Sequence, residues 1–257
     1  MDLVLTIARK EIVDGLRDVR SVIAALFYAL MGPLVVGLVS VTVSAKGTSG
    51  AAVLTSMIGI FTLVSAFVGG MNVAMDTIAG ERERKSLLPL LLTAVPRERI
   101  VIGKWLAVNF FAVAGLIANL LGFAVVLAFS GTHSYGFRNL LAVGWSLFSL
   151  PLLAASIQLF ISTASHTTKE AQTYLSLVVF APMAIGMFMV FSSAGKYGWL
   201  NCLPLIGQQI QFQSLMNGRD NGLIQPAVVS GLTIALAMLL LIACTDRLQR
   251  DEILYGN

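Results

Sequence analysis

Six stretches of this chain are long and apolar enough to cross a lipid bilayer, and no other feature constrains its fold as much. A spanning helix needs about 20 mostly apolar residues to cover the hydrocarbon thickness. The six stretches are Ser21 to Val43, Ala51 to Met75, Trp105 to Phe129, Leu140 to Thr163, Tyr174 to Phe191 and Leu223 to Cys244. Since 57% of the 257 residues are hydrophobic and only 12% are charged, no part remains for a soluble domain of ordinary size. The sequence predicts an all-α membrane protein with a single transmembrane domain over residues 1–257.

The basic residues outside these stretches are distributed very unequally between the two sides of the membrane. One side carries Arg9, Lys10, Arg17, Arg20, Arg82, Arg84, Lys85, Arg97, Arg99, Lys104, Lys169, Arg247 and Arg250, and the other carries Lys46, Arg138, Lys196 and Arg219. The positive-inside rule then predicts that both termini lie in the cytoplasm. We expect a multi-pass protein of a bacterial or archaeal cytoplasmic membrane. The bases are not interleaved with aromatic residues, so nucleic acid is not an expected partner.

Residues 1–20 predict a helix that lies along the inner surface of the membrane. Apolar residues recur there at steps of three and four, as in Leu5, Ala8, Ile12 and Leu16, while Lys10 and Asp14 lie on another face. Such a helix is either an interfacial anchor or a support for a cytoplasmic partner.

A dense mixed-charge segment, residues 76–104, separates the second and third stretches. The second helix is expected to continue past Asp76 into Glu81–Lys85, and Ser86 is a suitable cap for a short helix with Pro89 in its first turn. The leucines of that short helix must be buried against lipid, against the rest of this protein or against a partner protein. Lys104 and Trp105 are expected at interface depth, as anchors. We therefore expect a cytoplasmic elbow of helices. The alternative explanation is that the basic residues only keep this loop on the cytoplasmic side of the membrane.

The run "AGERERKSLLPLLLTAVPRERIVIGKWLA" resembles the loop after the second span in type-2 permeases of ATP-binding-cassette (ABC) exporters. "IARKEIVDGLRDVRS" resembles their interfacial helix, and "LPLIGQQIQFQSLMNG" their outer segment before the last span. The nearest group is the sodium-efflux (Nat-type) permeases. The chain departs from the family pattern at Lys85 and Leu88, where Gly or Arg and Glu are usual, and at Pro96, which comes two residues late.

This resemblance implies a coupling helix seated in a cleft of a separate ATPase subunit. The residues that it assigns to coupling are Gly80, Glu81, Arg82, Glu83, Arg84, Ser86, Leu87, Leu90 and Leu91. It also implies a second permease copy or a related permease as partner, with ATP and Mg²⁺ held on the ATPase. Reversing the charges of Glu83 and Arg84 is then expected to lower transport-linked ATP hydrolysis.

The chain lacks the motifs that its own catalysis would need. There is no G-x-x-x-x-G-K-[ST] loop for nucleotide phosphates, no H-E-x-x-H and no G-x-S-x-G. The sequence thus predicts no cofactor or metal in this chain and favours a permease. A non-transporting scaffold remains an alternative, and an intramembrane hydrolase a weaker one.

Four neutral polar residues fall within the apolar stretches: Asn72, Asn109, Asn119 and Gln158. They are candidates for the transport path, although interhelical bonding is the more common use of such amides. Residues 192–222, rich in glutamine, are expected to form an outer re-entrant or cap segment, which the resemblance makes part of an outer gate. The cargo stays open between a lipid, a hydrophobic peptide or drug, and sodium.

Overall fold

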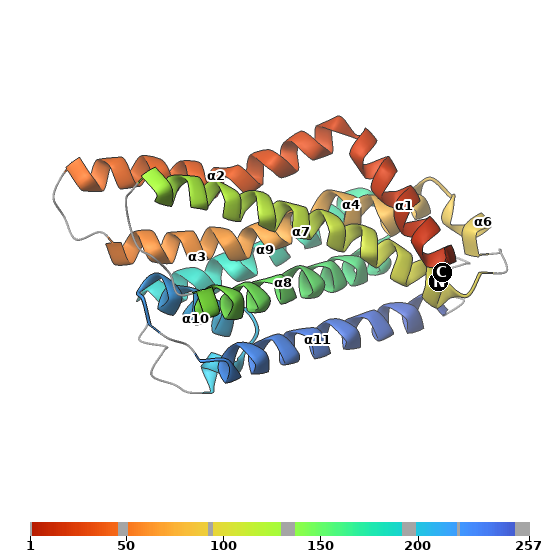
Figure 1. Ribbon diagram of the computed structural model, residues 1–257. Helices are drawn as coiled ribbons and strands as arrows, with labels where there is room; N and C mark the ends of the chain where they lie inside the picture. Colours follow the sequence, from red (N-terminus) through yellow and green to blue (C-terminus); the bar gives the residue numbers. More distant parts are fainter. Residues whose placement is uncertain are drawn as a thin grey trace.

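The computed structural model describes residues 2–45, 51–91, 95–129, 137–191, 199–219 and 222–249, and it is an elongated helical bundle (Figure 1). In chain order its elements are α1 (Asp2–Arg17), α2 (Val19–Ala45), α3 (Ala51–Val68), α4 (Met71–Met75), the π-helical turn η1 (Asp76–Gly80), α5 (Glu81–Glu83), α6 (Leu87–Leu91), α7 (Arg97–Phe129), α8 (Phe137–Ala164), α9 (Thr168–Phe191), the 3₁₀ turn η3 (Leu200–Cys202), α10 (Ile206–Met216) and α11 (Ile224–Gln249). The described residues contain no strand, so the all-α prediction is confirmed.

The described residues contain six membrane-length helical segments, as the hydropathy pattern predicts. They cover Val19–Val41, Leu54–Glu83, Arg97–Ala128, Val143–Ala164, Thr168–Met189 and Ile224–Gln249. The second is a composite of α3, α4, η1 and α5, which continue one another with a break at Gly69 and Gly70. It reaches Glu83, because the charged residues after Asp76 stay helical.

The third span begins earlier than its apolar residues indicate. Helix α7 starts at Arg97, whereas the apolar stretch starts at Trp105. One face of these two extra turns packs inside the protein, since Ile100, Val101 and Lys104 are all fully buried, whereas Glu98 and Arg99 are exposed. The turn that separates the second and third spans is therefore shorter than residues 76–104. It runs from Arg84 to Pro96 and contains α6.

Two of the spans form the centre of the bundle. The buried share is 61% for Leu54–Glu83 and 67% for Val143–Ala164, against 22% for both Val19–Val41 and Thr168–Met189. The central helix α3 crosses α7 closely, because a side chain at Gly115 would approach the Cα of Gly69 to 3.0 Å. Small residues allow such close approach of helices within a membrane. The outer spans α2 and α9 leave apolar side chains facing outward.

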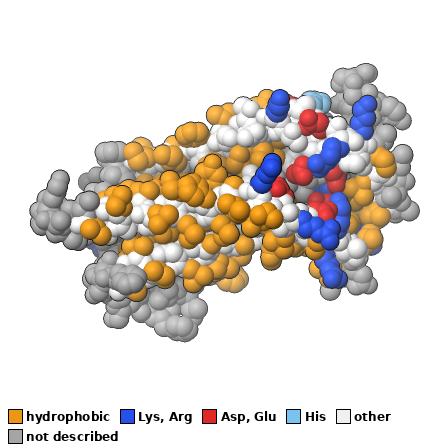
Figure 2. Space-filling view, turned by 90° about the horizontal axis from the view of Figure 1, so that it is seen from above, with side chains coloured by type: hydrophobic (Ala, Val, Ile, Leu, Met, Phe, Trp, Pro, Cys, Tyr) orange, Lys and Arg blue, Asp and Glu red, His pale blue; other side chains and the backbone are white. Residues whose placement is uncertain are grey.

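The two ends of the bundle differ in chemistry. Helices α1 and α6 and the last residues of α11 lie together at one end, and α10 lies at the other (Figure 1). We call the first the elbow end. In the face seen in Figure 2, basic and acidic side chains gather toward one end, and hydrophobic side chains cover most of the remaining described surface.

Helix α10 folds back into the bundle at the end opposite the elbow. Its Gln208, Gln209 and Gln211 are completely buried. The Gln208 amide donates to the hydroxyls of Thr233 on α11 (2.9 Å) and Ser149 on α8 (3.4 Å), and Gln209 donates to the carbonyl of Ser56 on α3 (3.4 Å). These amides join α10 to three spans, so it is not a cap with its amides at the surface.

Candidate functional site

A buried ion-pair network lies where α1, α5 and α7 meet, at the elbow end. The Lys104 ammonium is 2.8 Å from Glu81 Oε1 and 3.0 Å from Glu11 Oε1, and it donates to the carbonyl oxygen of Thr77 at 2.7 Å. All three donors of the ammonium are therefore used. Lys104 is 0% exposed, and a charge that is so deeply buried persists only when it is well paired.

A second ammonium completes this network from the surface. Lys10 Nζ lies 3.2 Å from Glu11 Oε1 and 3.7 Å from Glu81 Oε1, and Asp14 is also within 3.7 Å. Although partial burial lowers the pKa of Lys10, the carboxylates of Glu11, Glu81 and Asp14 outweigh it and raise that pKa. Two lysines thus balance two buried glutamates, one lysine being buried and the other exposed.

The prediction that Lys104 and Trp105 anchor the third span at the membrane surface is wrong for Lys104. Its side chain points into the protein because Glu11 and Glu81 meet it there. Trp105 is half-buried and donates from Nε1 to Ser156 Oγ at 3.0 Å. Both side chains therefore join helices within the bundle.

The other side of the elbow is joined to the turn between α8 and α9. The Arg82 guanidinium donates to the carbonyl oxygens of Ser165 (2.5 Å) and Thr163 (3.0 Å). The Glu83 carboxylate accepts from the backbone N–H (2.9 Å) and hydroxyl (2.6 Å) of Thr168. The end of the composite second span is thus held by α1 and α7 on one side and by α8 and α9 on the other.

The residues assigned to coupling divide into an inner and an outer set. Gly80, Glu81 and Leu87 are buried, Arg82 is half-buried, and Leu90 packs on an apolar cluster of α7, α8 and α11. Of the assigned residues, Glu83, Arg84 and Ser86 are exposed, and so are the neighbouring Lys85 and Pro89. The side chain of Leu91 lies outside the described residues. A docking partner can therefore reach only part of the assigned set.

Local geometry at the elbow depends on specific residues. A side chain at Gly80 would collide with Asp76 Oδ1, so the glycine leaves room for the 3.0 Å ion pair between Asp76 and Arg84. The hydroxyl of Ser86, expected to cap α6, donates to the carbonyl of Glu81 at 3.2 Å and so closes the preceding helix. Lys85 turns the chain with a φ of 57°.

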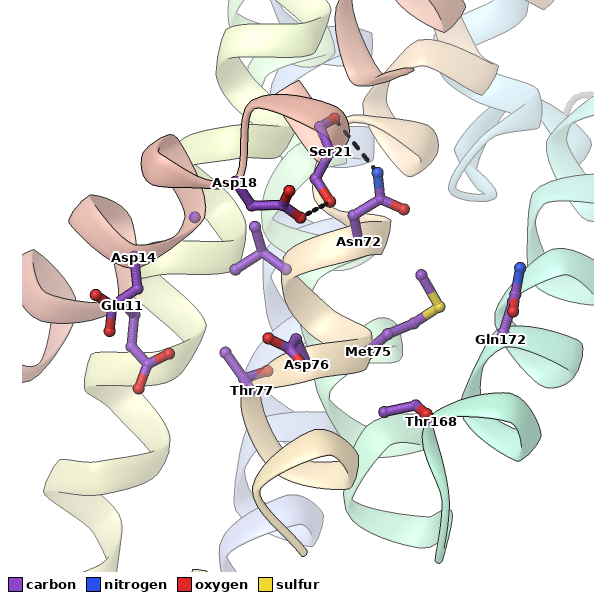
Figure 3. A pocket seen from close by; sticks show the side chains of 12 residues that line it. Glu11, Asp14, Asp18, Ser21, Asn72, Met75, Asp76, Thr77, Thr168 and Gln172 are labelled. Atoms are coloured by element: carbon purple, nitrogen blue, oxygen red, sulfur yellow. Dashed lines mark hydrogen bonds between the residues drawn. The ribbon is translucent and has the colours of Figure 1, made fainter. Parts of the chain in front are cut away.

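A pocket of about 400 Å³ separates α1 from α9, beside α4 and η1 (Figure 3). The charged residues that line it are all acidic: Glu11, Asp14, Asp18 and Asp76. Each has a partner in the structure, namely Lys104, Lys10, Ser21 and Arg84 respectively. The Ser21 hydroxyl lowers the pKa of Asp18. The pocket leaves unfilled space between α1 and the end of the second span.

Three of the four amides proposed for a transport path bond to the backbone of another helix. Asn72 lines the pocket and donates to the carbonyl of Ser21 at 3.4 Å. Asn119 joins α7 to α2 through the carbonyl of Ala29 at 2.8 Å, and Gln158 joins α8 to α3 through the carbonyl of Phe67. Asn109 is half-buried. Their contacts support the interhelical role more than a common path.

We expect Asn119→Leu to lower the free energy of unfolding by about 0.6 kcal/mol, the typical value for an interhelical hydrogen bond in a membrane. The reason is the loss of the bond to the Ala29 carbonyl in a side chain only 1% exposed. Unfolding in mixed micelles measures the loss. A path role would instead give normal stability and strongly altered transport.

Sequence reasoning missed Glu11 and the α8–α9 partners of the elbow. A usable signal existed for Glu11, because Val4, Ala8, Glu11 and Gly15 fall on one face of α1 at helical spacing. This face packs on α7, where a side chain at Gly103 would meet Ile7 at 2.8 Å. An acid within such a face indicates a buried cation nearby. No comparable signal marks Ser165 or Thr168.

Comparison with known proteins shows the family of this chain. The sequence model for ABC-2 family transporter proteins matches residues 5–245, almost the whole chain. The chain belongs to this family. Together with the six apolar helices, membership makes it an integral membrane protein of the ABC-2 transporter type.

Two relatives carry permease names. The chain is 34% identical over 212 residues to the ABC transporter permease protein NatB of Bacillus subtilis (strain 168), an alignment that covers 77% of this chain and 52% of NatB. It is 33% identical over 127 residues to the probable ABC transporter permease protein NosY of Pseudomonas aeruginosa, with 48% of this chain and 44% of NosY covered. The chain thus spans about half the length of these relatives.

Proposed function

We propose that this ABC-2 protein is the membrane subunit of an ATP-driven exporter. It supplies half of a translocation path, pairs with a second permease copy or a related permease, and docks separate ATPase subunits that hold ATP and Mg²⁺. Its family, the permease names of NatB and NosY and the lack of a phosphate-binding loop in the sequence support this proposal. The basic elbow end is the cytoplasmic end by the positive-inside rule.

The observation that carries the proposal is the double attachment of the elbow. Lys104 ties Glu81 to α1 and α7, while Arg82 and Glu83 tie the same segment to the α8–α9 turn. A force applied to the exposed elbow therefore reaches four spans at once. If the charges of the elbow served only to keep this loop in the cytoplasm, the internal bonds of Glu81, Arg82 and Glu83 would not be needed.

In this scheme the ATPase moves the bundle because the contacts between the ATPase and the elbow differ between two states. ATP binding brings two ATPases together, and the elbow makes different contacts before and after that movement, as any ligand-driven switch requires. The composite second span then moves as a lever about its break at Gly69 and Gly70, between α1 and α9. The pocket between those helices supplies space for the displacement.

The docking surface that we propose differs from the set assigned by resemblance. Arg84, Lys85, Ser86 and Pro89 form it, because these side chains are exposed and Glu81 and Leu87 are not. Glu83 is exposed as well, but its carboxylate is used by Thr168. A charge reversal at Glu83 would therefore disturb an internal contact together with docking.

The double variant Arg84→Glu with Lys85→Glu tests docking without touching the internal bonds of Arg82 or Glu83. We expect its Kd for the ATPase subunit to rise at least about tenfold, a cost of about 1.4 kcal/mol, because two exposed cations of the docking surface become anions. Membrane insertion stays normal. The Kd is measured by binding of the ATPase subunit to the variant in detergent, and the consequence for coupling is measured as ATP hydrolysis in lipid vesicles.

Arg219→Glu is the matched control, since Arg219 is exposed next to α10 at the opposite end. It is expected to bind the ATPase like the parent chain. Unchanged binding in the double variant would count against the elbow as the docking site. Normal docking without ATP-dependent movement of the bundle would favour a non-transporting scaffold.

A further inference from the structure

Helix α1 has two different long faces. Val4, Ala8, Glu11 and Gly15 face α7, and a side chain at Gly15 would approach the Phe111 ring to 2.8 Å. On the outer side Leu5 and Leu16 are 55% and 50% exposed, and Val19 and Ile23 at the start of α2 are 61% and 62% exposed. This apolar outer face is continuous with the outward-facing side chains of α2, which lie among lipid chains in a spanning helix.

Three arginines border that apolar face: Arg9, Arg17 and Arg20. All three are exposed, and none forms an ion pair with a carboxylate in the part of the chain that the structure describes. Arg20 lies near enough to Asp18 to lower its pKa, as one of the weaker influences on that group. The neighbouring Lys10, by contrast, is engaged by Glu11, Glu81 and Asp14.

The position of these arginines defines which partner suits them. Arg9 and Arg17 lie on α1 and Arg20 lies at the start of α2, and α1 runs in a different direction from the spanning helix α2 (Figure 1). Charged side chains gather toward one end of the face seen in Figure 2, and hydrophobic side chains cover most of the rest of the described surface. Guanidinium groups at the border of a lipid-facing apolar surface are suited to lipid phosphodiester groups, because they bind phosphate oxygens in a bidentate manner.

We infer that the outer face of α1 is a binding surface for anionic phospholipid headgroups, with Arg9, Arg17 and Arg20 as the headgroup contacts. Leu5, Leu16 and Val19 cover the adjoining acyl chains. Basic residues beside a membrane interact with anionic lipids in this way, and an amphipathic helix adds apolar burial. The bound lipid would brace α1, and through Glu11 and Lys104 it would brace the elbow.

The test uses the purified full chain in nanodiscs that contain equal amounts of phosphatidylglycerol and phosphatidylcholine. Native mass spectrometry measures the ratio of the two lipids that stay bound on release. We expect an excess of phosphatidylglycerol, and in the triple variant Arg9→Gln, Arg17→Gln, Arg20→Gln this ratio should fall at least about fivefold, the factor for one basic residue near an anionic surface.

The control triple variant Arg99→Gln, Lys169→Gln, Arg247→Gln removes the same charge from other exposed positions of the described chain. It is expected to keep the ratio of the parent. An equal fall in both variants would show an effect of net charge alone and overturn the inference. So would an unchanged ratio in the α1 variant. No ATPase is present in the nanodiscs, so either result leaves the proposed function untouched.

Discussion

Lys104→Met is expected to reduce the free energy of unfolding by about 3–5 kcal/mol, the cost of leaving a buried ion pair without one partner. Methionine matches the lysine stem in size, but it cannot neutralise Glu11 and Glu81, whose side chains are only 10% and 11% exposed. It also leaves the Thr77 carbonyl without its donor from Lys104. Unfolding in mixed micelles, followed by circular dichroism, measures the change.

Lys10→Met is the matched control within the same network. Lys10 faces the same carboxylates, but its side chain is 59% exposed, so the loss is expected to stay below about 1 kcal/mol. Adding Glu11→Gln and Glu81→Gln to Lys104→Met should recover more than half of the large loss, because no ionised carboxylate then stays buried without a cation. Equal effects of Lys104→Met and Lys10→Met would contradict the buried network.

Arg82→Met is expected to separate ATP hydrolysis from movement of the bundle. It removes the two bonds to the Thr163 and Ser165 carbonyls and leaves the exposed docking residues in place. Coupling free energies between sites are about 1–3 kcal/mol, so the loss should lower the ATP-dependent population of the moved state about tenfold. Spin labels at Arg99 and Thr173, both exposed, report this state by their distance.

Arg84→Met is the control for this experiment. Arg84 also carries a guanidinium at the elbow, but its partner Asp76 is exposed and their ion pair is at the surface. It should retain the ATP-dependent change in label distance wherever the ATPase is still bound. If Arg82→Met kept that change in full, the contact with the α8–α9 turn would have no part in transmission.

The membrane architecture was predictable from hydropathy because each span is a nearly continuous apolar run. The early start of α7 was not, because Arg97, Glu98 and Arg99 precede any apolar run. Only the packing of Ile100, Val101 and Lys104 holds one face of those turns against the bundle. Lys104 illustrates the same limit. Beside Trp105, a lysine ordinarily indicates an interface anchor, and its burial depends on Glu11, 93 residues away in the chain.

The candidate site was predictable as a segment but not as a set of contacts. The interleaved charges of Glu81 to Lys85 indicated a functional elbow, yet nothing local separates buried Glu81 from exposed Arg84. That difference arises from the orientation of the last turns of the second span against α1, α7 and α8. Likewise, the glutamines of α10 suggest a half-buried helix, and their complete burial depends on acceptors from three distant spans, such as Thr233 and Ser56.

The most direct test of the account is cross-linking from the elbow to the ATPase subunit. In a background with Cys202→Ser and Cys244→Ala, which removes both free thiols of the described chain, Pro89→Cys places one thiol on the exposed elbow and Asn217→Cys places one beside α10. With a maleimide–benzophenone cross-linker, which needs a thiol at one end only and reacts with nearby C–H bonds on irradiation, position 89 should join to the ATPase with a yield that changes on adding ATP, and position 217 should not. Labelling of the thiol at position 89 by a small maleimide, with no cross-link to the ATPase in any nucleotide state, would contradict the account.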